Sequence, residues 1–155
     1  MEKFPMTPRG AKMVEDELRT LKKERPQISR DIGTAIEHGD LKENAEYHAA
    51  KDRQGINEMK IRDLEAKTAL AEVIDPKSLS GEMVKFGATL TLTNLDTDEE
   101  VIYQIVGADE ADGKRLISIS APLARAMIGK SLGDEVTIRL PSGERSFEIG
   151  DVQYI

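Results

Sequence analysis

Residues 7–35 read TPRGAKMVEDELRTLKKERPQISRDIGTA and carry the most regular pattern in the chain. Thr7 followed by Pro8 is a typical helix start, because threonine caps free backbone N–H groups and proline needs no N–H bond in the first turn. Apolar residues then recur at intervals of four and three if Arg25 is counted: Val14, Leu18, Leu21, Ile28, Ile32 and Ala35. Pro26 removes one backbone hydrogen bond but leaves this spacing in register. The heptad pattern predicts a long helix packed lengthwise on a partner.

A second helical segment is expected from about Gly39 to Val73. Its apolar residues fall into two groups offset by two positions, with Gly55 near the change: Ala45, Ala49, Ile56 and Met59, then Ile61, Leu64 and Ala71. The simplest assembly of the two segments is an antiparallel hairpin whose arms, of roughly 29 residues each, are about 43 Å long. A long solvated surface of this kind accounts for most of the charged side chains.

The second half of the chain has the pattern of short strands. Apolar and polar residues alternate in several stretches, which we interpret as strands at 88–94, 101–106, 116–120, 135–140 and 146–149. Residues 122–128 form a short helical stretch that ends at Gly129, a typical C-terminal cap. The sequence thus predicts an α+β fold: an antiparallel coiled-coil hairpin over 1–76 with an acidic tip at 37–47, a linker at 77–81, and a small antiparallel β-sheet domain over 82–155.

Composition excludes several classes of protein. The 155 residues include no Cys and no Trp, which rules out disulfide scaffolds, thiolate metal sites and cysteine nucleophiles. The net charge of −7 argues against a simple duplex-DNA binder, because Lys and Arg supply most non-specific affinity for phosphates. No apolar run is long enough for a membrane span or a secretory signal. We therefore expect a soluble, cytoplasmic protein with no membrane partner.

The expected tip carries the most unusual group of residues. Residues 37–46 read EHGDLKENAE, with four acids against one lysine. Asp40 and Glu43 are three apart, so at a helix start they form a capping box, in which each side chain accepts from a free backbone N–H. The alternative is that the two carboxylates bind a hard cation such as Mg²⁺, which prefers oxygen ligands. Tyr47 lies one turn further on, where a thin hairpin is expected to leave it exposed.

Residues 39–50, GDLKENAEYHAA, resemble the tip motif of the bacterial Gre transcript-cleavage factors, and specifically the GreA type. Similar stretches run along the whole chain, at 5–10, 73–75, 86–89, 94–96, 105–107, 109–112, 121–125 and 128–130. The resemblance implies an N-terminal coiled coil and an FKBP-like C-terminal domain that docks on RNA polymerase at its secondary channel. It also implies that the tip helps to hold Mg²⁺ in the polymerase active centre, where a backtracked RNA 3′ end is cut.

Site residues follow from the resemblance position by position. The tip acids correspond to Asp40 and Glu43, which implies that they hold Mg²⁺ only within the polymerase complex. The remaining residues implied are Asn44 and Tyr47 beside the metal, Lys42, Lys51 and Arg53 toward the RNA, and Ser120, Pro122, Leu123 and Arg125 in the docking loop. The factor is then expected to be a monomer that completes the polymerase's own site and has no independent enzymatic activity.

Other readings stay open at this point. A structural coiled-coil adaptor explains the heptads and the acidic charge, but leaves Tyr47 and the tip acids without a role. A relative that binds the channel without promoting cleavage is a second possibility, against which the intact Asp40 and Glu43 pair argues. A prolyl isomerase is disfavoured, because the four aromatic residues of 82–155 stand at positions that suit a core. The sequence assigns no role to His38 or His48.

Overall fold

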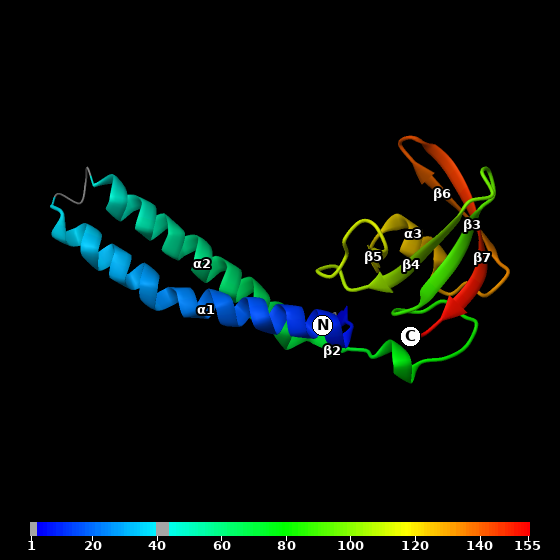
Figure 1. Ribbon diagram of the computed structural model, residues 1–155, viewed down its shortest axis with the longest axis horizontal. Coiled ribbons are helices and arrows are strands. Elements are labelled where there is room, and N and C mark those ends of the chain that lie inside the picture. The colour runs from blue at the N-terminus through cyan, green and yellow to red at the C-terminus, as the bar shows by residue number, and fades with distance from the viewer. Residues whose placement is uncertain (1–2, 40–43) are drawn as a thin grey trace. The chain divides into compact units, whose positions relative to one another are not determined.

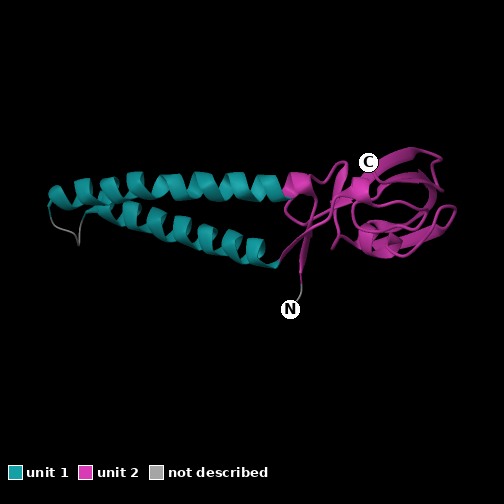
Figure 2. Cartoon of the chain, turned by 90° about the horizontal axis from the view of Figure 1, so that it is seen from below, with its two compact units in different colours: residues 1, 11–70 teal, residues 2–10, 71–155 magenta. Residues whose placement is uncertain are grey.

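The computed structural model describes residues 3–39 and 44–155 (Figure 1). Asp40, Lys42 and Glu43 therefore lie outside the described residues. The chain divides into two compact units (Figure 2). The hairpin unit comprises Ala11–Leu70, and the sheet unit comprises Glu2–Gly10 together with Ala71–Ile155. No helix within the described ranges has an apolar stretch long enough to cross a membrane.

The hairpin unit consists of two long antiparallel helices, α1 (Pro8–Glu37) and α2 (Ala45–Leu70) (Figure 1). The heptad pattern of α1 is confirmed: its positions that face α2 are buried or half-buried, and these are Val14, Leu18, Leu21, Ile28, Ile32 and Ala35. Pro26 lies inside α1, which continues on both sides of it. The predicted helical hairpin is therefore correct, including the proline within its first arm.

Helix α2 packs through a different set of residues from the one predicted. Its buried residues are Ala50, Asn57, Ile61 and Leu64, with Tyr47 and Gln54 half-buried at the same spacing. Ile56 and Met59 of the first predicted apolar group are 51% and 50% exposed, so that group was wrong. The packed face is one continuous seam, which the sequence conceals because two of its positions, Gln54 and Asn57, are polar.

Helix α2 also ends three residues earlier than predicted. Residues 71–73, expected to be helical, form strand β2 (Ala71–Val73), which pairs in parallel with β1 (Phe4–Met6). The Ile74 N–H donates to the Met6 carbonyl and extends this pairing. The backbone of residues 71–73 thus pairs with β1, which is distant in the sequence, and does not form the last turn of α2. A short 3-10 helix, η1 (Pro76–Ser78), follows, with the Asp75 side chain as its cap.

The sheet unit contains a five-stranded sheet in the order β5-β4-β3-β7-β6. Its strands are β3 (Thr89–Asn94), β4 (Glu100–Val106), β5 (Leu116–Ser118), β6 (Glu135–Leu140) and β7 (Gly143–Gln153). Neighbouring strands are antiparallel except β4 and β5, which are parallel, in contrast to the fully antiparallel sheet expected. Helix α3 (Pro122–Met127) packs against the same core, which confirms the α+β fold class.

The core of the sheet unit is almost entirely apolar. Several large residues without measurable exposure come from the central strands and from α3: Leu90, Leu92, Ile105, Met127 and Ile149. Phe86 and Phe147 are buried in the same cluster, and Tyr103 and Tyr154 pack against it. The aromatic residues are therefore used for packing, as the sequence predicted.

A buried carboxylate, Glu110, holds the start of α1 within the sheet unit. Glu110 is 5% exposed, and its carboxylate accepts hydrogen bonds from the Thr7 N–H, the Thr7 hydroxyl and the Gly107 N–H. Thr7 in turn accepts from the Gly10 N–H, so it caps α1 as predicted. A Cβ atom at Gly10 would overlap the Glu110 carboxyl group, so glycine leaves the space that the carboxylate occupies. Sequence analysis did not predict this contact, which joins residues 103 positions apart.

Candidate functional site

The candidate site lies where the two arms of the hairpin meet. Helix α1 ends at Glu37 and α2 begins at Ala45, so the acidic segment 40–43 falls between them in the chain. The structure describes the residues on either side of that segment, His38, Gly39 and Asn44. The described part of the candidate site therefore consists of the end of α1 and the start of α2.

Asn44 caps α2 and also joins the two arms. Its Oδ1 accepts from the Tyr47 N–H at 3.1 Å, which is the typical contact of an N-cap side chain. Its Nδ2 donates to the Ala35 carbonyl of α1 at 2.6 Å. Asn44 therefore caps α2, which begins at Ala45, whereas the capping-box interpretation of Asp40 and Glu43 concerns residues outside the described ones.

A second contact links the arms beside Asn44. The His38 Nδ1 and the Glu46 Oε2 are 2.8 Å apart, and both side chains are more than half exposed. We call the contacts of Asn44 with Ala35 and of His38 with Glu46 the tip clasp. The tip clasp thus joins the end of α1 to the start of α2.

Tyr47 is half-buried rather than exposed as predicted. It occupies the first position of the packed seam of α2, one turn before Ala50. Its ring lies edge-on to that of His48, with ring centroids 5.5 Å apart. Packing therefore accounts for an aromatic residue here, and the supposed exposure of Tyr47 no longer favours a role in function.

The two described basic residues that the resemblance directed toward RNA differ in their contacts. Arg53 forms an ion pair with Asp31 of α1 at 3.0 Å, which places its guanidinium across the hairpin. Lys51 donates to the neutral Gln54 side chain at 3.1 Å and keeps its positive charge uncompensated by that contact. Lys51 is thus the better candidate for a phosphate, and Lys42 lies outside the described residues.

The predicted docking residues lie at the start of α3. Ser120, Pro122 and Arg125 are exposed, whereas Leu123 is half-buried and packs against the core. The Ser118 hydroxyl accepts from the Ser120 N–H at 3.1 Å and lies 2.7 Å from the Ser120 hydroxyl. The structure therefore groups three side chains on a surface and uses the fourth, Leu123, to support it.

No cluster of three or more metal-ligating side chains occurs within residues 3–39 and 44–155. The two carboxylates predicted to hold Mg²⁺ are Asp40 and Glu43, which are outside those ranges. Asn44, the third oxygen donor of the motif, has its carbonyl oxygen and its amide nitrogen bonded to backbone groups. Asn44 therefore joins the start of α2 to the end of α1 through both ends of its side-chain amide.

Comparison with known proteins identifies the class. Residues 4–73 match the family "Transcription elongation factor, N-terminal", and residues 79–154 match "Transcription elongation factor, GreA/GreB, C-term". Curated GreA transcription elongation factors of Brucella anthropi and Brucella suis are each 54% identical to this chain over 157 residues and cover 100% of both chains. The fold and its sequence are thus those of a transcription elongation factor. The chain belongs to the GreA/GreB family and, within it, to the GreA type, as its tip motif predicted.

Solved structures give a weaker likeness. Gfh1 of Thermus thermophilus, described as a GreA factor homolog, is 22% identical with a TM-score of 0.45 and covers 98% of this chain and 99% of its own. A GreA/GreB factor of Nitrosomonas europaea is 23% identical with a TM-score of 0.44, over 98% of this chain and 100% of its own. The family membership rests on the sequence matches.

Proposed function

We propose that this chain binds RNA polymerase and stimulates the cleavage of backtracked RNA near its 3′ end. The observation that supports this most directly is the acidic segment 40–43 of a GreA-type chain, which connects two helices whose ends the tip clasp joins. The hairpin then serves as a narrow arm that carries two carboxylates into the secondary channel. We place this activity in the cytoplasm and assign it to a monomer.

Asp40 and Glu43 are the residues that hold Mg²⁺ in this proposal. When bound, a divalent cation of this kind activates water and stabilises the leaving oxygen in phosphodiester hydrolysis. The chain itself contributes position: Asn44 secures the start of α2, and His38 with Glu46 secures the end of α1. Two carboxylates alone bind Mg²⁺ weakly, since the ion is usually completed by waters and phosphates. We therefore infer that the chain has no hydrolytic activity without the polymerase.

The surface around Ser120, Pro122 and Arg125 is the docking site in this proposal. Pro122 occupies the first turn of α3, where its ring keeps the backbone rigid. Arg125, one turn later, offers a planar cation that suits a carboxylate of the partner. Leu123 anchors the helix to the core from the other side. Docking and chemistry are thus assigned to different units of the chain.

The decisive experiment replaces Asp40→Asn together with Glu43→Gln in a stalled elongation complex. We expect cleavage to fall by about 100-fold or more, because both metal-binding charges are lost. Thermal stability should be unchanged, because the cap of α2 is Asn44. The matched control, Glu17→Gln with Asp63→Asn, removes two exposed carboxylates of the hairpin and should cleave normally.

Two results would separate the alternatives. Full cleavage by the Asp40 and Glu43 variant would overturn the metal-holding role. A wild-type chain that binds the polymerase without any cleavage would support the channel-binding relative instead. Pro122→Ala with Arg125→Ala should raise the concentration needed for half-maximal cleavage and leave the rate at saturation intact, since only docking is affected.

A further inference from the structure

Pro26 weakens α1 near its middle. Proline has no N–H, so the carbonyl of Lys22, four residues earlier, loses its regular helical partner. Helix bends sharper than about 20° are nearly always found at such sites. The end of α1 at Glu37 is 11 residues further on, which is about 16 Å of helix. A change of about 20° in the bend at Pro26 would therefore move the tip end of α1 by about 5 Å.

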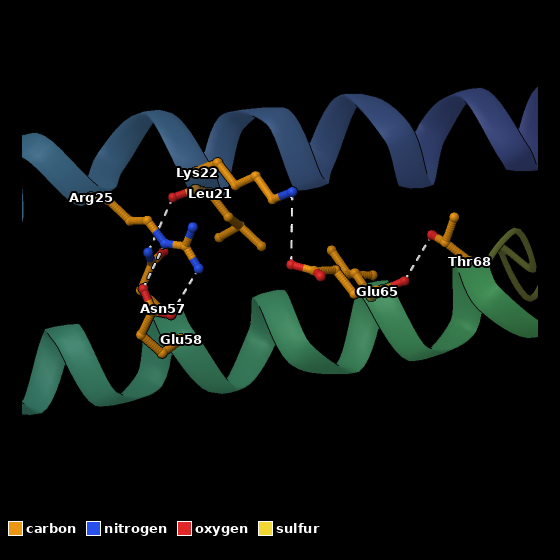
Figure 3. A network of polar contacts seen from close by, with 8 residues as sticks. Leu21, Lys22, Arg25, Asn57, Glu58, Glu65 and Thr68 are labelled. Carbon is orange, nitrogen blue, oxygen red and sulfur yellow. Dashed lines mark hydrogen bonds and ion pairs between the residues drawn. The ribbon is translucent and has the colours of Figure 1, made fainter.

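Three contacts from α2 meet α1 just before Pro26 (Figure 3). The Asn57 Nδ2 donates to the Leu21 carbonyl at 3.1 Å. The Arg25 guanidinium donates to both carboxylate oxygens of Glu58, at 2.7 and 2.8 Å. The Lys22 Nζ lies 3.7 Å from a Glu65 oxygen. Leu21, Lys22 and Arg25, next to the weakened turn, thus each contact a residue of α2.

Asn57 is an unusual residue for its place. It is 4% exposed in a seam that otherwise buries Ala50, Ile61 and Leu64. Within the described ranges nothing donates to its Oδ1, and a cavity of about 180 Å³ lies beside it. Burying an amide with an unmatched oxygen costs stability compared with an apolar side chain. An asparagine at this position is therefore expected to serve a purpose other than the stability of the hairpin.

We propose that Asn57 and Glu58 brace α1 at the turn just before Pro26 and are positioning residues for the tip end of α1. The brace joins the Leu21 carbonyl and the Arg25 side chain, which flank the turn that lacks a backbone hydrogen bond, to neighbouring residues of α2, so a change in the bend of this turn strains both contacts. Its effect on activity rests on the proposed function, since misplacement of reacting groups by about 1 Å can cost 100-fold in rate. The brace itself is a property of the free protein.

Spin-label distances test the brace directly. The chain has no cysteine, so Lys12→Cys and Thr34→Cys give two exposed labelling sites on either side of Pro26, about 33 Å apart along a helix. We expect one narrow distance distribution in the otherwise unchanged protein. Asn57→Ala with Glu58→Gln should broaden it toward shorter distances. Adding Pro26→Ala should narrow it again, because the missing backbone bond is restored.

The matched control is Gln54→Ala. Gln54 lies on the same seam, one turn from Asn57, and its side chain accepts a hydrogen bond from Lys51 of its own helix. We expect this variant to keep the narrow distribution. An unchanged distribution in the brace variant, or a broad one that Pro26→Ala does not narrow, would overturn the proposal.

Cleavage assays then test the consequence for function. The brace variant should cleave about 10-fold more slowly at saturating factor, with an unchanged half-saturating concentration, and Pro26→Ala should restore the rate. A general loss of folding would not be repaired by a change at Pro26 alone. If the wild-type chain failed to stimulate cleavage while the distances behaved as expected, the proposed function would fail and the brace would stand. Normal cleavage by a variant with a broadened distribution would contradict the positioning role.

Discussion

Different kinds of interaction stabilise the sheet unit and the hairpin unit. The sheet unit closes around a cluster of twelve buried apolar residues between its sheet and α3. The hairpin unit has only a single seam, and its arms are also joined by exposed ion pairs such as Arg25 with Glu58 and Arg53 with Asp31. A thin pair of helices has no interior that could replace these contacts, so polar groups take a larger share of its specificity.

The exposure of charged side chains also differs between the two units. In the sheet unit the carboxylate of Glu110 is buried and has three backbone or hydroxyl donors within the unit. In the hairpin, the side chains of the Lys and Arg ion pairs that join the two arms are between 40% and 51% exposed. Salt and pH should therefore act on the hairpin contacts much more than on the Glu110 contacts, while truncation of buried groups should act most on the sheet unit.

The largest effect is expected for Leu92→Ala in the core of the sheet unit. Leu92 is fully buried in β3, so the change leaves a cavity and should lower the free energy of unfolding by about 3 kcal/mol. Urea unfolding measures this directly. Leu95→Ala, just beyond the strand and 38% exposed, is the control and should cost less than about 0.5 kcal/mol. Equal losses of unfolding free energy for the two variants would mean that burial in the core does not stabilise the sheet unit.

An intermediate effect is expected for Gly10→Ala, at the point where α1 begins in the sheet unit. The added methyl group would displace the Glu110 carboxylate from its donors, so we expect a loss of about 1–3 kcal/mol. Gly33→Ala is the same change in the same helix, where no described atom lies within 4 Å of the added carbon. It should stabilise α1 by about 0.5–1 kcal/mol. Thermal melts that moved in the same direction for both variants would refute the role of Glu110.

The smallest effect is expected for Glu58→Gln in the hairpin. Its hydrogen bond with Arg25 lowers the pKa of Glu58 below its ordinary value of 4.5. The stabilisation is therefore present above that value and is lost as the pH falls through the lower pKa of the folded state. We expect the difference in melting temperature between Glu58→Gln and wild type to be small, to vanish at low pH, and to shrink at about 1 M salt.

Glu15→Gln serves as the comparison for that measurement. Glu15 pairs with Arg19 of the same helix, four residues away, and so makes no contact between the arms. Its replacement should change the helical circular dichroism signal less than Glu58→Gln does. A larger effect at Glu15 would show that contacts along one helix matter more than those across the hairpin.

Sequence analysis succeeded where the relevant interactions are short-range. The α1 heptads, the Thr7 cap and the strands of the sheet unit all depend on residues a few positions apart, and the structure confirms them. It failed on α2, where apolar residues lie on more than one side of the helix and the packed face includes Asn57. It also gave no capping role to Asn44, whose side chain accepts from the Tyr47 N–H at the start of α2.

The sequence alone identified the acidic motif of the candidate site. The structure added the contacts between the arms that flank this motif. The acidic pair Asp40 and Glu43 was found from spacing and resemblance, and its role remains a proposal. The contact of His38 with Glu46 could not be foreseen, because the two residues are eight positions apart and belong to different arms of the hairpin. The ion pair of Arg53 with Asp31 likewise became visible only once the arms were paired.

The sequence by itself determined that this chain is a helical hairpin followed by a small sheet, because periodicity and turn residues act locally. It also determined membership of the GreA type, since the tip motif is contiguous. Only the tertiary structure decided which face of α2 packs, that residues 71–73 pair with β1, and that Glu110 holds the start of α1. Each of these joins residues far apart in the chain, where the choice among partners depends on burial and hydrogen bonding that exist only after folding.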